Sequence, residues 1–315
     1  MNSPEITIIV PICNGATYLS ETLNSLLSQT FTNFELLAID DGSTDASSEI
    51  VRSFKDDRVR LIRKENCGLC HTLNRGIAEA RASYIARNDQ DDISVPQRFD
   101  RQLKVMKNHP EAIALFAYNT KFGGKHHWSN ADKLTMSIGE LMQYEPMKDG
   151  CLLGSTMFAR TAALKSIGGF RQPYYPVDDW DIECRLAQAG KVLVIREPLV
   201  AYRFQAGANT YRVFAEMREK SRWVRDSNSR RQQSLPELTF DQFRLAQPND
   251  GWSRLGRYRR DSAKLQMRTA GQRYLDGRYL TAAAHLVAAV VLNPADIAGR
   301  VSRYFSRSTR IQVED

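Results

Sequence analysis

The first half of this 315-residue chain alternates short apolar runs with segments whose apolar residues recur at helical spacing. The apolar runs, which predict strands, occupy residues 6–12, 34–40, 59–63 and 83–86. The segments with helical spacing occupy residues 17–29, 46–54, 69–80 and 96–108. Such alternation predicts an α/β fold, in which a parallel sheet carries helices on both faces.

The second half follows a different pattern. Further strands are predicted at residues 155–159, 191–195 and 199–204. A helix is predicted from Asp179 to Gly190, and after Tyr211 the chain is predicted to be mostly helical, with Gly277 at the turn of a helix–turn–helix unit. We therefore expect an α/β domain over residues 1–210 and a helical C-terminal region over residues 211–315.

The composition is that of a globular protein, with 42% hydrophobic and 25% charged residues. The apolar run Ile6–Pro11 is too short for a signal peptide, and Ala282–Leu292 is too short to span a bilayer. These observations predict a cytoplasmic protein without a membrane span. Among the five cysteines, Cys67 and Cys70 form a C-x-x-C pair, but no second pair of metal ligands accompanies it, so a zinc site is not predicted.

Basic residues are concentrated in the last third of the chain. Lys and Arg number 24 against 25 Asp and Glu over residues 1–210, but 20 against 11 over residues 211–315. This asymmetry predicts either a surface for an anionic partner, such as lipid headgroups or nucleic acid, or a solvated helical face. Because the segment has no recognisable nucleic-acid recognition motif, a nucleic-acid partner is not expected.

The segment "ARNDQDD" ends the fourth predicted strand with three carboxylates, Asp89, Asp91 and Asp92. Like charges this close raise one another's pKa, which implies that a positive group lies nearby. In an extended segment Asp89 and Asp91 point to the same side, as two ligands of a Mg²⁺ or Mn²⁺ ion would. A calcium loop is not predicted because its sixth position would be Ser94 instead of Gly. An acidic helix cap before Pro96 is the alternative.

Three polar clusters follow strands of the predicted sheet, at Pro11–Asn14, Asp40–Asp45 and Arg87–Asp92. Ligands of α/β sheets bind beyond the carboxyl ends of the strands. The sequence therefore predicts that three loops meet at one acidic crevice large enough for a nucleotide.

A fourth acidic cluster, "DDWD", lies at the start of the helix predicted near residue 179 and contains Asp178 and Asp179. Carboxylates at this place stabilise a helix N-terminus. A carboxylate at the mouth of a cleft is also suited to accept a proton from a hydroxyl nucleophile. Trp180, within the cluster, is suited either to stack on a sugar or to pack in the core.

In order and spacing, the motifs "PICN", "IDDGSTD", "ARNDQDD" and "PVDDWDIECR" resemble the family-two inverting glycosyltransferases. The resemblance covers about residues 5–205. It implies the GT-A fold of the nucleotide-diphospho-sugar transferases, a Rossmann-like mixed sheet with helices on both faces. The helical C-terminal region would be an addition to that fold.

The resemblance also implies roles for individual residues. The residues that it places at the nucleotide-sugar donor are Pro11, Asn14, Asp41, Asn66, Arg87, Asp89 and Arg203. Asp91, together with Asp89, is implied to form the D-x-D motif that holds a Mg²⁺ or Mn²⁺ ion. Asp179 is implied to be the general base, and Trp180 and Asp178 are implied to contact the acceptor.

The activity implied by the resemblance is metal-dependent, inverting transfer of a sugar from a nucleotide-diphosphate donor, with uracil as the expected base. The acceptor would be a hydroxyl of a glycan or lipid-linked glycan in cell-surface polysaccharide synthesis. Relatives of this kind work at the inner face of the bacterial membrane, and the basic residues 211–315 would contact anionic lipid there.

Two alternative functions are retained. The first is a scaffold that binds a nucleotide-sugar without turnover, and it rests on three departures from the family pattern. Cys13 stands where an aromatic residue is usual, and Leu153 and Gln205 stand at or near positions where His is common. The second is a sugar nucleotidyltransferase, which the loop "PICNGATY" disfavours because it has one Gly and no Lys or Arg.

Overall fold

The computed structural model describes residues 3–122, 140–203, 213–248, 250–275 and 277–295. These residues form two compact units. The first contains the described residues within Met1–Phe122, Trp128–Arg203 and Lys220–Glu237, and the second those within Phe204–Glu219 and Leu238–Asp315. The domain division at residues 210 and 211 stays a prediction, and the first unit includes a helical segment beyond it.

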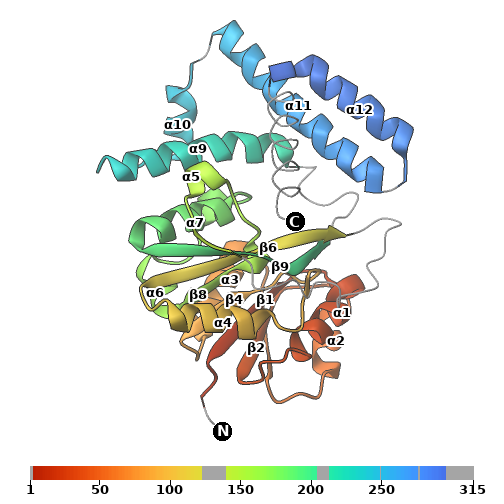
Figure 1. Ribbon diagram of the computed structural model, residues 1–315, viewed down its shortest axis with the longest axis vertical. Helices are drawn as coiled ribbons and strands as arrows, with labels where there is room; N and C mark the ends of the chain where they lie inside the picture. The colour runs from red at the N-terminus through yellow and green to blue at the C-terminus, as the bar shows by residue number, and fades with distance from the viewer. Residues whose placement is uncertain (1–2, 123–139, 204–212, 249, 276, 296–315) are drawn as a thin grey trace, which may run out of the picture. The chain divides into compact units, whose positions relative to one another are not determined.

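Within the described residues, nine strands form one mixed sheet in the first unit (Figure 1). They are β1 (Ile6–Ile12), β2 (Phe34–Asp41), β3 (Val59–Lys64), β4 (Tyr84–Arg87), β5 (Ile93–Ser94), β6 (Ala112–Phe122), β7 (Leu141–Gln143), β8 (Phe158–Arg160) and β9 (Lys191–Arg203). Their order is β3-β2-β1-β4-β8-β6-β9-β5, and β7 also pairs with β9. β3, β2, β1 and β4 run parallel, whereas β8 runs antiparallel to both β4 and β6. The α/β class and the mixed sheet are confirmed.

Helices cover both faces of this sheet (Figure 1). They are α1 (Ala16–Leu27), α2 (Ser47–Ser53), α3 (Leu69–Glu79), α4 (Arg98–Asn108), α5 (Pro146–Asp149), α6 (Thr161–Ser166) and α7 (Asp178–Ala189), with short 3₁₀ turns η2 (Gly154–Thr156) and η3 (Gln172–Tyr174). Alternate residues of β1 enter different cores: Ile8 packs with Leu23 of α1, and Ile9 packs with Leu73 of α3. Successive side chains of a strand point to opposite faces, so α1 and α4 lie on one face and α3, α6 and α7 on the other.

Two strand predictions differ from the structure. The strands predicted at residues 191–195 and 199–204 are one strand, β9, whose register against β6 shifts between Ile195 and Pro198. Proline donates no backbone hydrogen bond, and the irregularity around it makes one strand read as two in the sequence. The structure also contains β6, which was not predicted. Its run of residues 112–118 is continuously apolar, and periodicity alone does not distinguish such a run from a buried helix segment.

The second unit is helical in its described part. α9 (Phe214–Gln232) begins in the second unit and ends in the first, and α10 (Phe240–Ala246), α11 (Gly251–Leu275) and α12 (Tyr279–Leu292) follow. α11 and α12 pack as a hairpin around Gly277, whose φ of +73° is favourable for glycine (Figure 1). The predicted turn at this glycine is confirmed. In the part of the chain that the structure describes, no helix combines the length and apolar character needed to cross a membrane.

A methyl group at Gly76 tests the packing of α3 against β1. The Cβ of Gly76→Ala would lie 2.7 Å from the Cδ1 and Cγ2 atoms of Ile9. We expect this change to lower the free energy of unfolding by about 1–3 kcal/mol, because a full core has to shift to admit the methyl group. Urea unfolding measures the loss. Gly271→Ala in α11, where nothing lies within 4 Å of the added Cβ, serves as the control. Equal stability of the two variants would contradict the packing described.

Candidate active site

The polar loops that follow β1, β2 and β4 meet at one edge of the sheet. These strands run parallel, so their carboxyl ends at Ile12, Asp41 and Arg87 lie at the same edge. Asn14, whose φ is +51°, accepts a hydrogen bond through its side-chain oxygen from the backbone N–H of Thr44 at 2.9 Å. The predicted convergence of the first two loops is confirmed.

Gln90 joins the first loop to the third. Its Oε1 accepts a hydrogen bond from the backbone N–H of Cys13 at 2.8 Å, and its Nε2 donates to the carbonyl of the same residue at 3.1 Å. Because Gln90 lies between Asp89 and Asp91, these bonds fix the backbone that presents both carboxylates. Sequence reasoning missed this residue, since an amide between two acids has the pattern of any polar loop.

Asp41 is held by the loop that follows β3. Its carboxylate accepts hydrogen bonds from the backbone N–H groups of Cys67 and Gly68, both at 2.9 Å, and pairs with the ammonium of Lys64. Burial alone would raise the pKa of Asp41, but these donors outweigh burial and hold the pKa below its usual range. A carboxylate has about four lone-pair positions, which leaves room for one donor from a nucleotide base.

The other predicted donor residues of the first loops lie around Asp41. The Nδ2 of Asn66 donates to the backbone carbonyl of Asp41 at 2.9 Å and contacts the Sγ of Cys13 at 3.4 Å. Partial burial, followed by the charge of Asp41, raises the pKa of the Cys13 thiol. Pro11 lies within β1, paired with Ile39, so the first loop begins after the strand end and not at Pro11.

Arg87 connects the third loop to α7. It is 2% exposed, its Nε donates to Oδ1 of Asp89 at 2.9 Å, and its Nη1 pairs with Asp179. Burial lowers the pKa of this guanidinium, but Asp179 and Asp89 outweigh burial and raise it above its ordinary value. A Cβ on Gly154 would lie 2.5 Å from Nη1 of Arg87 and 2.7 Å from Oδ2 of Asp179. The ion pair therefore requires glycine at this position.

A second buried cation lies behind the third loop. Arg98, in the first turn of α4, is 0% exposed and donates hydrogen bonds to the carbonyl of Arg87 and to Oδ1 of Asn88, both at 2.9 Å. Burial lowers the pKa of Arg98, and the charges of Asp92 and Asp89 oppose that effect. The crowded carboxylates thus have two buried cations as neighbours, which are the positive groups that their spacing implies. The sequence gives no signal for Arg98, because an arginine in a first helical turn is usually exposed.

Asp92 and Arg203 hold the end of the same loop. Asp92 is buried and accepts hydrogen bonds from Oγ of Ser155 at 2.5 Å and from the backbone N–H of Arg203 at 3.0 Å. Burial, with the charges of Asp89 and Asp91, raises the pKa of Asp92 well above its usual range. The Nε of Arg203 donates to the carbonyl of Asp91 at 2.9 Å. Arg203 therefore supports the D-x-D loop in this structure.

α7 brings the fourth acidic cluster to the same place. Asp178 is 3% exposed, and its Oδ2 has no hydrogen-bond partner among the described residues. Burial, followed by the charge of Asp179, raises the pKa of Asp178 to about 7. Burial also raises the pKa of Asp179, although Arg87 opposes the shift. A carboxylate with a raised pKa among polar groups is suited to accept a proton near neutral pH.

Trp180 is enclosed on the side of α7 that faces the interior. The indole is 6% exposed, its N–H donates to the carbonyl of Pro146 at 3.2 Å, and the guanidinium of Arg225 lies 5.0 Å from its ring centroid. Of the two alternatives for this residue, the structure shows core packing. No open ring face is left for a sugar in this conformation.

The donor set of the third loop fits a small divalent cation. Mg²⁺ and Mn²⁺ favour carboxylate oxygens, and Mg²⁺ sites typically use one or two carboxylates together with waters and substrate phosphates. Asp89 has a side chain that is 30% exposed, and Asp91 is half-buried. The described residues contain no group of three or more metal-ligating side chains, so substrate oxygens or waters would complete the coordination. Of the positions that depart from the family pattern, Leu153 is half-buried before η2, and Gln205 lies outside the described residues.

Comparison with known proteins gives the family. Residues 7–168, just over half of the chain, match the profile of Glycosyl transferase family 2. An uncharacterized glycosyltransferase of Rickettsia prowazekii is 25% identical over 227 residues, which cover 69% of this chain and 69% of that protein. The chain therefore belongs to glycosyltransferase family 2, and it is a glycosyltransferase.

Two solved structures show the same fold. The first is S. aureus TarS 1–349 in complex with UDP, with a TM-score of 0.55 and 16% identity over 94% of this chain and 92% of that chain. The second is the mannosyltransferase PcManGT from Pyrobaculum calidifontis in complex with GDP-Man and Mn²⁺, with a TM-score of 0.54 and 18% identity over 98% of this chain and 81% of that chain. The predicted GT-A fold is confirmed.

The raised pKa of Asp178 gives the pH dependence of stability a definite sign. A carboxyl whose pKa rises from 3.8 to about 7 on folding stabilises the fold while it is protonated, and this stabilisation is lost as the pH rises through the folded value. We expect Asp178→Asn and the unchanged protein to have the same free energy of unfolding at about pH 4. At about pH 8 the variant should be more stable, because the amide carries no charge to bury. Urea unfolding at both pH values measures the difference. Asp57→Asn, at an exposed position, should show no such crossover. A less stable Asp178→Asn variant at the higher pH would contradict this interpretation.

Proposed function

We propose that this glycosyltransferase is metal-dependent and inverting, and that it moves a sugar from a UDP-sugar to a hydroxyl of a glycan or lipid-linked acceptor. The observation that carries the proposal is the ion pair at Arg87, which joins Asp89 of the D-x-D loop to Asp179 of α7. A donor diphosphate bound at that loop would lie beside a carboxylate able to activate an acceptor. TarS holds UDP and PcManGT holds GDP-Man with Mn²⁺, which supports a nucleotide-sugar donor and a divalent cation.

In the proposed reaction, Asp179 is the general base. Its carboxylate takes the proton of the acceptor hydroxyl, and the hydroxyl oxygen attacks the anomeric carbon on the face opposite to the departing diphosphate. The bond to the diphosphate breaks as the new glycosidic bond forms, so the anomeric configuration inverts without a covalent enzyme intermediate. Arg87 provides a fixed positive charge beside the diphosphate. When bound at Asp89 and Asp91, a Mg²⁺ or Mn²⁺ ion would stabilise the leaving diphosphate as a Lewis acid.

The remaining donor contacts follow from the first two loops. We assign Asp41 to a hydrogen bond from the nucleotide base, with Asn66 and Asn14 fixing the loops around it. Arg203 is assigned to the donor diphosphate, because its Nε donates to the carbonyl of Asp91 in the D-x-D loop. Asp178 stays a proposed acceptor contact, whereas Trp180, which is enclosed, is not included.

Helix α11 of the second unit has a surface suited to membrane binding. It exposes Trp252 by 84% and Tyr258 by 66%, and these aromatic residues are interleaved with exposed arginines. Aromatic rings and basic side chains together suit the surface of an anionic bilayer, where each charge contributes about 1 kcal/mol. We therefore propose that the enzyme works as a peripheral protein at the cytoplasmic face of the membrane.

Two substitutions separate the proposed roles of the carboxylates. We expect Asp179→Asn to reduce sugar transfer by about 100-fold or more, because it removes the base. It should weaken UDP binding less than loss of a metal ligand does, because Arg87 keeps its bond to Asp89. Asp91→Ala should abolish transfer and also weaken Mn²⁺-dependent UDP binding, because it removes a metal ligand. Release of nucleotide diphosphate from a panel of nucleotide-sugars measures turnover, and product NMR identifies the anomer.

An exposed acidic residue provides the control for these variants. Asp57→Asn lies away from the crevice and should keep full activity. Near-normal turnover of Asp179→Asn would exclude it as the base. Nucleotide binding by the unchanged protein without any turnover would favour the scaffold function instead.

Lipid binding is tested by charge removal in α11. We expect Arg254→Ser with Arg260→Ser to lower the partition coefficient on phosphatidylglycerol vesicles about 30-fold, which corresponds to about 2 kcal/mol for two charges. Flotation of the full-length protein with vesicles measures it. The control is Arg52→Ser with Arg75→Ser, which removes the same charge from exposed positions of the first unit. Equal flotation of both double variants would contradict a role for α11.

A further inference from the structure

The segment Lys220–Glu237 follows the last strand of the sheet in sequence and packs against α7. Its buried side chains are Trp223, Val224, Ser227 and Asn228, whose spacing marks one face of a helix. The ring of Trp223 stacks on Tyr174 of η3, with centroids 3.9 Å apart and planes within 3°. The Nζ of Lys220 donates to the carbonyl of Tyr175 at 2.5 Å. This face therefore covers the turn that leads into α7.

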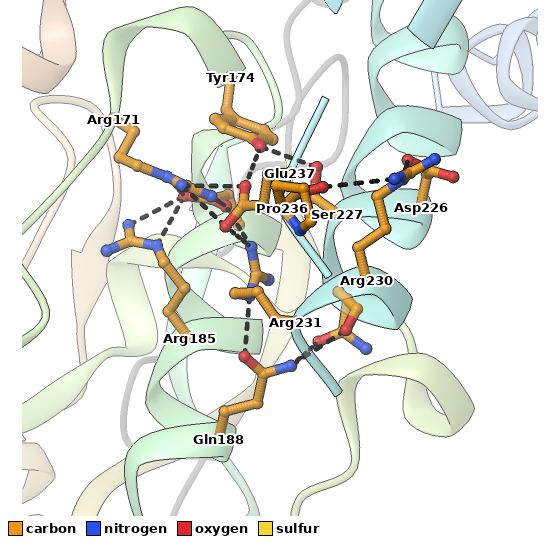
Figure 2. Close-up of polar contacts among 12 residues, drawn as sticks. Arg171, Tyr174, Arg185, Gln188, Asp226, Ser227, Arg230, Arg231, Pro236 and Glu237 are labelled. Atoms are coloured by element: carbon orange, nitrogen blue, oxygen red, sulfur yellow. Dashed lines mark hydrogen bonds and ion pairs between the residues drawn. The ribbon is translucent and has the colours of Figure 1, made fainter. Parts of the chain in front are cut away.

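Glu237, at the end of this segment, gathers three donors (Figure 2). Its carboxylate accepts hydrogen bonds from Nη1 of Arg171 at 3.1 Å, from Nη1 of Arg231 at 2.8 Å and from the hydroxyl of Tyr174 at 2.7 Å. Burial alone would raise the pKa of Glu237, but the bonds from Arg231 and Tyr174 outweigh it and hold the pKa below its usual range. Glu237 is thus a charged partner of the network at neutral pH.

The same network holds the first turn of α7. Asp181, two residues after Asp179, is 0% exposed. Its Oδ2 accepts hydrogen bonds from Nε of Arg171 and from Nε of Arg185, both at 2.9 Å. Nη1 of Arg231 lies 4.0 Å from Oδ1 of Asp181. Arg171 therefore bridges Glu237 directly to the helical turn that carries Asp179.

The charges of the network explain why Glu237 matters. Three guanidinium groups, of Arg171, Arg185 and Arg231, face the two carboxylates of Asp181 and Glu237. Without the charge of Glu237, one carboxylate would remain for three buried or half-buried cations. Removing one partner of such a cluster is costly because the remaining charges repel and stay desolvated.

The segment also contacts the far end of α7. Gln188, in the last turn of this helix, accepts a hydrogen bond from Nε of Arg231 at 2.8 Å (Figure 2). It also donates to Oδ1 of Asn228 at 2.8 Å. The helix is therefore held at both ends by residues of one segment. A helix held in this way keeps its N-terminal carboxylates at a fixed distance from β4.

We propose that Lys220–Glu237 is part of the catalytic unit and that Glu237 is a positioning residue for Asp179. It acts through Arg171 and Asp181 and does not touch the substrate. The kinetic part of this inference rests on the proposed function, whereas the structural part does not. In this protein the catalytic unit would therefore end after Glu237.

Hydrogen exchange of the full-length protein tests the structural part. We expect Glu237→Gln to speed amide exchange in residues 172–186 about tenfold, because hydrogen bonds to a charged carboxylate are lost where α7 begins. The control is Asp226→Asn, which breaks an ion pair with Arg230 on the same helix without contacting α7. Tyr174→Phe removes the hydrogen bonds of the hydroxyl to Glu237 and Ser227 but leaves both arginine bonds to Glu237. It should speed exchange in the same residues by a smaller factor, and it provides the test if Glu237→Gln does not fold. Unchanged exchange in both Glu237→Gln and Tyr174→Phe would overturn the proposal.

Kinetics test the positioning role. Glu237→Gln should lower kcat about tenfold with the KM for the nucleotide-sugar unchanged, since the donor loops lie outside the network. Glu237→Asp, which keeps the charge, should restore part of kcat. Faster exchange in a protein that transfers no sugar would leave the structural inference intact and count against the proposed function. Faster exchange with an unchanged kcat would overturn the positioning role alone.

Discussion

The ion pair between Arg87 and Asp179 is the interaction on which the rest of the site depends. Arg87 ends a parallel strand of the sheet, and Asp179, 92 residues later in sequence, lies in the first turn of α7. The same guanidinium also holds Asp89, so one buried cation sets the position of the D-x-D loop relative to α7. This constraint explains the glycine at position 154, because no side chain fits beside the ion pair.

The site concentrates negative charge, and the fold compensates it with cations in defined places. Arg98 lies behind the third loop and bonds to the carbonyl of Arg87 and the side chain of Asn88, and Arg171 and Arg185 pair with Asp181 of α7. Arg98 and Arg185 are buried and Arg171 is half-buried, and this burial strengthens their effect on the carboxylates. Asp89, Asp91 and Asp179 remain partly exposed. The proposed function assigns the first two to the metal and donor and the third to the base.

Sequence patterns predicted the α/β class and the convergence of the polar loops, because strand ends and acidic clusters are local features. They could not predict how the acids are paired. Arg98 and Gln90 have ordinary loop or helix-surface patterns, and only the tertiary structure buries the first and connects the second to Cys13. The contact between Glu237 and Arg171 joins residues 66 positions apart and has no sequence signal. The long-range pairing of polar side chains is therefore the part of the site that sequence patterns do not predict.

The D-x-D loop, whose negative charge Arg87 balances, is proposed to bind a nucleotide diphosphate through a divalent cation. Calorimetric titration of the full-length protein with UDP, with and without Mn²⁺, tests this proposal. The mechanism predicts clear binding with Mn²⁺ and a large loss of affinity without it, since the carboxylates repel an uncompensated diphosphate. UDP binding of equal strength under both conditions, or no binding under either, would contradict it.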